Sequence, residues 1–273
     1  MADQNDIDIL IADSVTKLDH RHRGAVLISG SHGGLYAGYC AAKAGVRGVI
    51  LNDASVGKDD AGIASLSYFD GLGAPAATVS HETALIGDGG HMVANGIISY
   101  VNLTAAALGC TVGQTATAAA RLMAAARQFE TAPPAYEEAR FPLRQEAGER
   151  EVWGLDSASL VRREDAGRIL IVASHGGLLA GNAAAALRVD AHAAIFNDAG
   201  VGIDRAGIGR LPALADRGIA AATVAASSAR IGDARSSWET GMISHVNGIA
   251  AGLGVAAGMT TKQAVDVLLH EDA

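Results

Sequence analysis

Aromatic side chains are scarce in this chain, at 4% of its 273 residues, and it contains only two cysteines. A core with few aromatic rings must be filled by aliphatic residues whose backbones approach closely, and the 34 glycines allow that approach. Cys40 and Cys110 lie in apolar stretches and have no counterparts in the other half of the sequence. We interpret them as small core residues rather than as a disulfide or a nucleophile.

Long basic runs and long apolar runs are also missing. The formal net charge is −8, so attraction to phosphate backbones or anionic lipid is not the organising feature. No apolar run reaches the ~18 residues that a membrane span needs, and the first residues are acidic where a signal peptide would be basic. We therefore expect a cytoplasmic protein whose partner is a small-molecule substrate, not nucleic acid or a membrane. Alanine- and glycine-rich helix faces also favour a homo-oligomer.

An internal repeat is the strongest pattern in the sequence. Ser31-His32 recurs as Ser174-His175, offset by 143 residues, and Asn52-Asp53 recurs as Asn197-Asp198, offset by 145. The offset of 145 then holds through the following motifs. The repeat predicts one α/β copy at residues 1–127 and a second at 150–273. Residues 128–149 are rich in Pro, Glu and Arg, which is typical of an exposed linker.

Each copy alternates short apolar runs with segments of helical character. The runs predict strands near 26–29, 48–51 and 76–79 in the first copy, and near 169–172, 193–196 and 221–224 in the second. None of them alternates with polar residues, which is typical of strands covered on both faces. The sequence therefore predicts an α/β protein: two tandem Rossmann-like β-α-β-α-β-α repeats with a mostly parallel sheet and pseudo-twofold symmetry.

Each copy is expected to have a helix between its second and third strands, and local signals mark three others. The first is the alanine-rich segment that follows each Gly-Gly pair, and the second is a long helix whose apolar residues repeat every three or four positions over 93–108 and 238–253. The third begins after an N-capping threonine, Thr115 or Thr260, and Gln263 completes a capping box in the second copy.

A histidine and an aspartate follow neighbouring strands in each copy. Residues that follow parallel strands emerge at one edge of a sheet, which is where ligands bind. We therefore expect His32 and His175 to act as general bases, with Asp53 and Asp198 orienting them. The alternative is a histidine that is hydrogen-bonded only for structure.

The residues beside each histidine have two interpretations. Ser31 and Ser174 are candidate nucleophiles, although serine is also a favoured N-cap at a helix start. Gly33-Gly34 and Gly176-Gly177 would present backbone N–H groups to a substrate anion or a developing oxyanion, or would simply allow a tight turn.

The loop after the third strand differs between the copies. The first copy carries His81, Glu82 and His91 there, which are weak candidates for a divalent metal site and are otherwise exposed loop residues. The second copy carries Arg230, a candidate anchor for a substrate carboxylate. No cofactor is required by the sequence. The remaining candidates for substrate contact are Asn52, Asn197, Ser228, Asp88 and Asp233.

These motifs favour an enzyme that acts on a small carboxylate-bearing metabolite by His/Asp acid–base chemistry, most simply by hydrolysing an amide or ester. Two alternatives remain open. Duplicated bases could serve an isomerase or racemase, and glycine turns could serve a non-catalytic small-molecule binding protein.

Overall fold

The structure is a computed structural model, and it describes residues 8–270. The acidic start of the chain lies outside the described residues. The chain divides into two compact units: unit 1 contains the described residues up to Asp53 together with Ile63–Tyr136, and unit 2 contains Ala54–Gly62 together with the described residues from Glu137 onward. Among the described residues, no helix has the length and apolar character needed to cross a membrane.

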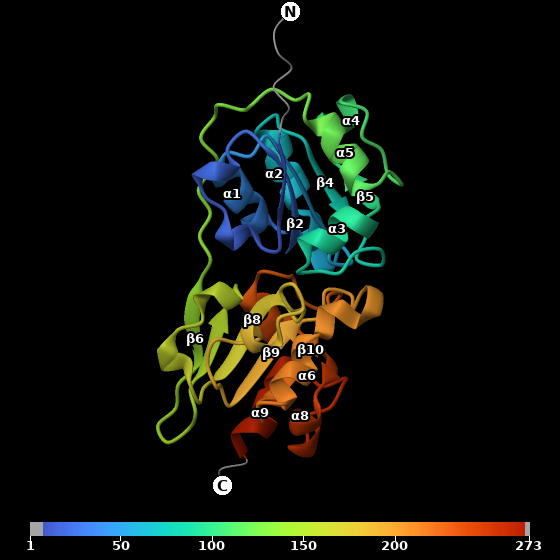
Figure 1. The fold of residues 1–273 in the computed structure, drawn as a ribbon. Helices are drawn as coiled ribbons and strands as arrows, with labels where there is room; N and C mark the ends of the chain where they lie inside the picture. The colour runs from blue at the N-terminus through green and yellow to red at the C-terminus, as the bar shows by residue number, and fades with distance from the viewer. Residues whose placement is uncertain (1–7, 271–273) are drawn as a thin grey trace, which may run out of the picture. The chain divides into compact units, whose positions relative to one another are not determined.

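Unit 1 is built on a five-stranded sheet with the sequential order β1-β2-β3-β4-β5 (Figure 1). The strands are β1 (Ile9–Ala12), β2 (Val26–His32), β3 (Gly48–Asn52), β4 (Ala76–Val79) and β5 (Ile98–Val101). The first four are mutually parallel, and β5 pairs antiparallel to β4. The prediction of an α/β protein with mostly parallel strands is confirmed.

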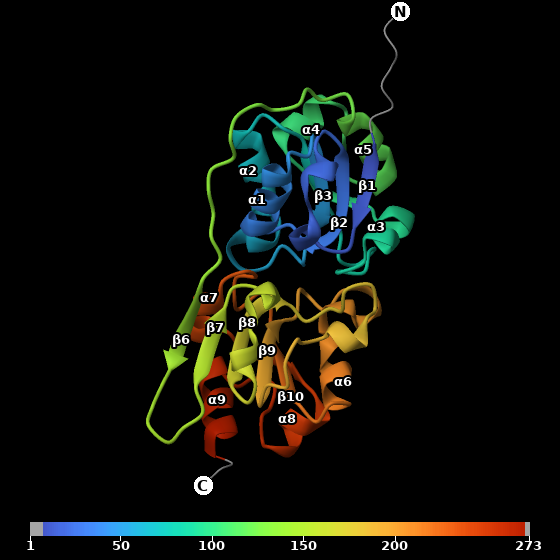
Figure 2. The ribbon, with the colours of Figure 1, turned by 60° about the vertical axis from the view of Figure 1, so that its left-hand side comes forward.

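Helices cover both faces of the unit 1 sheet. Helices α1 (Leu35–Ala44) and α2 (Ser65–Gly71) lie on one side, and α3 (Gly89–Asn95) and α5 (Ala116–Met123) lie on the other (Figure 2). Alternate residues of one strand enter different cores: Leu27 packs with the α1 and α2 residues, whereas Ile28 packs with those of α3 and α5. This explains why the strand runs read as continuously apolar.

Unit 2 is built on a six-stranded sheet with the order β11-β10-β9-β8-β7-β6. The strands are β6 (Arg140–Arg144), β7 (Val152–Leu155), β8 (Ile169–His175), β9 (Ala193–Asn197), β10 (Ala220–Val224) and β11 (Ile243–Val246). Strands β7 to β10 are parallel, and the two edge strands are antiparallel to their neighbours. Its helices are α6 (Arg210–Ala215), α7 (Ala234–Thr240), α8 (Gly248–Gly252) and α9 (Thr261–Leu269).

The prediction of one long helix in each copy is wrong. Residues 93–108 instead form the end of α3, strand β5 and the short helix α4 (Leu103–Ala107), and residues 238–253 form the end of α7, β11 and α8. Gly96 and Gly241 end α3 and α7 in an extended conformation, and the side chains of Asn102 and Asn247 cap new helices. The final helices are confirmed: Thr115 caps α5, and Thr260 forms a capping box with Gln263 at α9.

The helix predicted after the second Gly-Gly pair is also absent. Helix α1 forms in the first copy, but the corresponding stretch of the second contains only the 3-10 turn η6 (Ala183–Ala185). The buried Arg210 side chain donates from Nε to Gly177 O, at 3.0 Å, and from Nη1 to Ala186 O. In the sequence register, Arg210 replaces the small buried residue Ser65 of the first copy. The guanidinium therefore donates hydrogen bonds to two backbone carbonyl groups that would have accepted backbone N–H groups in a regular helix.

Candidate active site

The loop between β4 and α3, residues 80–88, crosses the carboxyl ends of the neighbouring strands in unit 1. Its Ala84 carbonyl accepts from Asn52 Nδ2 at 3.1 Å, and Gly87 N–H donates to Gly30 O at 2.7 Å. At its end, Gly89 N–H donates to Asp13 Oδ1 at 3.1 Å, beyond β1. A Cβ atom on Gly30 would lie 2.4 Å from Asp88 N, so glycine is required where this loop passes over β2. The crossing brings residues that follow β2, β3 and β4 to one edge of the sheet.

Asp53 and His81 form a carboxylate–imidazole pair at this edge. Asp53 Oδ1 lies 2.9 Å from His81 Nδ1 and also accepts the His81 backbone N–H at 3.0 Å. The Asp53 side chain is 5% exposed, whereas that of His81 is 20% exposed. Because an ionised carboxylate only accepts hydrogen bonds, His81 Nδ1 carries the proton and Nε2 is the basic nitrogen of the neutral ring. This is the arrangement that orients a histidine for general-base catalysis.

His32 carries its ring proton on the other nitrogen. Its Nδ1 accepts the Gly34 backbone N–H at 3.1 Å, so the proton of the neutral ring is on Nε2. Burial lowers the pKa of His32 from 6.5 to about 4. The ring is therefore neutral near pH 7 with its proton on Nε2, which differs from the general-base role expected for it. Asp53, expected to orient His32, instead holds His81.

The lowered pKa of His32 predicts a pH-dependent loss of stability. Between pH 6.5 and about 4 the unfolded state binds a proton that the folded state resists, so the free energy of unfolding falls as the pH falls. The contribution of this group should drop by ~3 kcal/mol across that window, because each pKa unit is worth about 1.4 kcal/mol. Urea titrations of the wild type and His32→Gln between pH 7 and pH 4 measure it as the difference in slope. Parallel curves for the two proteins would contradict the prediction.

The backbone N–H groups of both Gly-Gly pairs are engaged within the chain. Gly33 N–H donates to Asn52 O at 2.7 Å, and Gly34 N–H donates to His32. In the second copy, Gly176 N–H donates to Asn197 O at 2.8 Å, and Gly177 N–H donates to His175 Nδ1 at 3.2 Å. These groups orient the histidines instead of offering the expected anion site.

The two candidate nucleophiles have structural partners. Ser31 Oγ accepts Val15 N–H at 3.0 Å, and Ser174 Oγ accepts Ala158 N–H at 2.9 Å, so each holds the loop that follows the preceding strand. Both serines are buried. These contacts favour an anchoring role over nucleophilic attack.

Most of the expected substrate contacts also belong to the scaffold. Asp88 and Asp233 are the N-caps of α3 and α7. Asn197 Nδ2 donates to Ala229 O at 3.1 Å, as Asn52 does to Ala84 O. Ser228 Oγ donates to Ala225 O and accepts Met242 N–H. The sequence alone could not distinguish a structural role from ligand binding, because the same polar residue types serve both.

Unit 2 has no imidazole at the position that corresponds to His81. Ala226 occupies it, and Asp198 Oδ1 accepts the backbone N–H groups of Ala226 and Gly200, each at 2.9 Å. His175 is buried at the end of β8. The carboxylate that was expected to orient His175 therefore organises the backbone of the second unit.

Arg230 is engaged with carboxylates of the chain itself. Its Nη2 lies 2.9 Å from Asp233 Oδ2 and its Nη1 lies 3.0 Å from Asp59 Oδ2, within unit 2. The hydrogen bonds that Arg230 donates to Asp233 and Asp59 raise the pKa of its guanidinium. A substrate carboxylate would have to displace one of these partners, which weakens the expected anchoring role.

The metal candidates do not form a donor cluster. Across residues 8–270, no group of three or more His, Cys, Asp or Glu side chains is arranged to hold a metal ion. His81 Nδ1 faces Asp53, and His91 Nδ1 accepts Leu85 N–H at 3.2 Å. The divalent-metal hypothesis stays a prediction without support from ligand geometry.

A left-handed turn follows Asp53, and it was not predicted from the sequence. Ala54, Ser55 and Val56 have φ values of 45°, 64° and 63°. A left-handed backbone conformation costs roughly 1–2 kcal/mol for each L-residue. Residues in this conformation occur where the surrounding structure enforces it, often at functional sites. Ala199 and Val201 repeat the feature after Asp198, with φ values of 49° and 66°. The aspartate of each copy thus ends its strand at a strained turn.

Comparison with known proteins adds no assignment: no family model, curated protein or solved structure matches the chain.

Proposed function

We propose that the chain is an acid–base enzyme whose catalytic residues lie in unit 1, and that it hydrolyses a small amide or ester. We also propose that its two units arose as tandem copies of one Rossmann-like β-α-β-α-β-α repeat. The shared motifs and the matching Asn52 and Asn197 hydrogen bonds support that origin. The loss of the His81 equivalent in the second copy favours the first as the catalytic one.

The 2.9 Å contact between His81 Nδ1 and Asp53 Oδ1 carries the proposal. A buried carboxylate fixes the His81 tautomer and stabilises the imidazolium that forms when Nε2 takes a proton. The partial exposure of His81 leaves its ring accessible to water. Neither feature is needed for packing alone.

In the proposed reaction the two histidines have different roles, because they carry their protons on different ring nitrogens. His81 Nε2 removes a proton from water as the water oxygen bonds to the substrate carbonyl carbon, giving a tetrahedral intermediate. His32 Nε2–H donates a hydrogen bond to the developing oxyanion, and its low pKa keeps the ring a neutral donor. The imidazolium of His81 then protonates the departing amine or alkoxide as the carbon–heteroatom bond breaks. The products are a carboxylic acid and an amine or alcohol.

The test uses purified protein, small amides and esters, and water enriched in ¹⁸O. The panel contains matched neutral and carboxylate-bearing substrates, because the groups expected to bind a carboxylate are occupied. We expect one ¹⁸O atom in each carboxylic acid product. In a parallel incubation in D₂O, deuterium exchange into recovered substrate without cleavage would instead identify an isomerase. Thermal stabilisation by a compound recovered unchanged, without turnover of any other, would identify a binding protein.

A further inference from the structure

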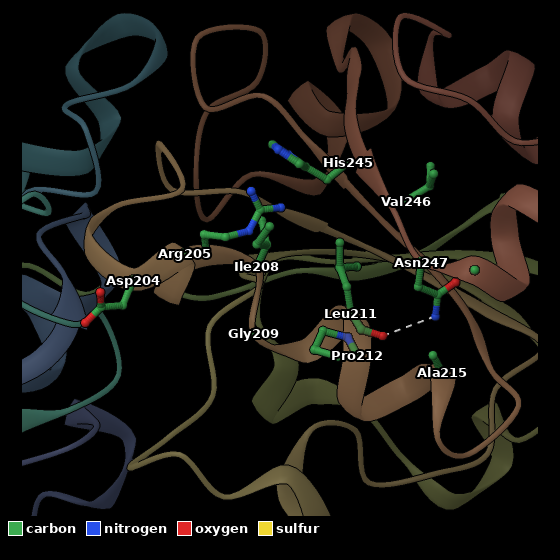
Figure 3. Close-up of a pocket in the computed structure, with 11 residues that line it drawn as sticks. Asp204, Arg205, Ile208, Gly209, Leu211, Pro212, Ala215, His245, Val246 and Asn247 are labelled. Atoms are coloured by element: carbon green, nitrogen blue, oxygen red, sulfur yellow. Dashed lines mark hydrogen bonds between the residues drawn. The ribbon is translucent and has the colours of Figure 1, made fainter.

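A second candidate site lies wholly within unit 2. A cavity of about 580 Å³ runs along helix α6 and strand β11 (Figure 3). Pockets for small organic ligands occupy roughly 300–1,000 Å³. The cavity is therefore large enough for a small molecule, and it contains none of the residues proposed for hydrolysis.

The lining of this cavity is apolar along most of its length. Ile208, Leu211, Pro212, Ala215 and Val246 contribute aliphatic surface. Asn247 also borders it, but its Nδ2 donates to Leu211 O at 3.2 Å and its Oδ1 caps α8. Asn247 thus belongs to the scaffold, and the apolar wall fits the hydrocarbon body of a ligand.

His245 can meet a ligand in this cavity through one of its two ring nitrogens. Its Nδ1 is buried and has no hydrogen-bond partner among the described residues, so Nδ1 is closed to a ligand as well. The ring lines the cavity, and its other nitrogen, Nε2, is neither buried in this way nor hydrogen-bonded within the described part of the chain. A ligand oxygen in the cavity would accept an Nε2–H hydrogen bond.

Arg205 gives the cavity a positive group. Its backbone N–H donates to Gly202 O at 3.2 Å, but its side chain makes no hydrogen bond or ion pair within the described part of the chain. In Figure 3 the guanidinium extends toward the side chains of Ile208 and His245. The Asp204 side chain extends the other way in the same view. A guanidinium and an imidazole donor together match a carboxylate, which accepts several hydrogen bonds.

The first copy carries larger side chains in the same sequence register. Tyr100 corresponds to His245, Asp70 to Ala215 and Leu103 to Gly248. Asp70 also accepts hydrogen bonds from the backbone of Leu103 and Thr104, which ties that region together. A Cβ atom on Gly248 would meet nothing within 4 Å. The second copy therefore has smaller side chains at these three positions of the cavity lining.

We propose that this cavity of unit 2 binds a small carboxylate with an apolar body. The carboxylate lies against Arg205 and His245, and the hydrocarbon part lies against Ile208, Leu211 and Val246. Binding here is independent of the proposed hydrolysis, because no residue is shared between the two sites.

The probe for the test is 3-phenylpropionate, titrated into the full-length protein by calorimetry. We expect a Kd of about 0.1 mM, which is realistic for a ligand of this size. The alcohol 3-phenylpropanol should bind about tenfold more weakly because it lacks the charge that pairs with Arg205. No heat from 3-phenylpropionate at concentrations up to about 10 mM would overturn the proposal.

Three variants locate the binding. Gly248→Leu restores the residue found in the first copy and should abolish binding by filling the cavity, and Arg205→Gln should weaken it about tenfold. Arg163→Gln is the matched control, since it makes the same substitution at an exposed arginine that does not line the cavity, and it should leave Kd within about twofold. Circular dichroism confirms that each variant is folded. Unchanged affinity in both Gly248→Leu and Arg205→Gln would place the ligand elsewhere and refute the assignment.

Discussion

Replacing His81 with Gln is expected to lower kcat for hydrolysis about a thousandfold or more. Glutamine can still hydrogen-bond to Asp53, but it cannot take a proton from water near neutral pH. General-base catalysis contributes roughly 10² to 10⁴ in rate, and loss of an oriented histidine falls at the upper end of that range. Initial rates at saturating substrate measure the effect, and KM should change much less than kcat.

Two further variants make the His81 result specific. His20→Gln removes another histidine, an exposed one, and should leave kcat unchanged within about twofold. Glu82→Gln tests the metal hypothesis, because a metal held by His81 and Glu82 would make both variants inactive. If His81→Gln keeps wild-type turnover, the proposed role of the Asp53–His81 pair is disproved.

The six strands β2, β3, β4, β8, β9 and β10 were predictable because their signal is local and strong. Each predicted run coincides with a strand of the structure, and β4 was predicted at its exact bounds, Ala76–Val79. The ends of β2 and β8 were missed. Both strands continue to the histidine through a register shift, which depends on the neighbouring strand and not on local sequence. Edge strands β1 and β6 were missed because they lack a continuous buried run.

The prediction of one long helix from apolar periodicity failed because the chain reverses direction inside the predicted segment. Val93 and Val101 of the predicted stripe do pack against a core, but they reach it from two separate elements, α3 and β5. Leu103, in α4, is 79% exposed. Spacings of three and four residues can arise from a helix followed by a strand, so periodicity without attention to Gly96 and Asn102 was misleading. A glycine followed by a helix-capping asparagine was the available signal.

The location of the candidate site was predictable, but the assignment of roles was not. Parallel strands placed His32, Asp53 and the third loop at one edge, as the sequence suggested. Which histidine pairs with Asp53 depends on how the loop from β4 crosses the sheet. Which ring nitrogen carries the proton depends on single backbone contacts, such as Gly34 N–H to His32 Nδ1. The absence of a His81 equivalent at Ala226 was the sequence clue to which copy we propose as catalytic.

Strand β6 lies within the stretch expected to be an exposed linker, and a buried ion pair holds it in unit 2. Arg140 of β6 makes two hydrogen bonds of 2.7 Å to Asp165, which is fully buried. The Arg140 guanidinium also lies 4.3 Å from the centre of the Trp153 ring. Arg168 adds a third contact to Asp165 at 2.9 Å. Burial alone would raise the pKa of Asp165, but the hydrogen bonds from Arg140, from the Arg162 backbone and from Arg168 outweigh it and lower the pKa.

Replacing Asp165 with Ala is therefore expected to reduce the stability of unit 2 by about 3–5 kcal/mol, because it leaves the Arg140 guanidinium buried without its carboxylate. Urea unfolding measures the free energy, and hydrogen exchange should show the amides of β6 exchanging faster than those of β8. Glu164→Ala is the matched control: Glu164 is exposed and lies 3.7 Å from Arg162, so its loss should cost less than about 1 kcal/mol. Equal effects of the two substitutions would show that the buried pair does not hold β6, and that Pro142 and the other contacts of the strand are sufficient.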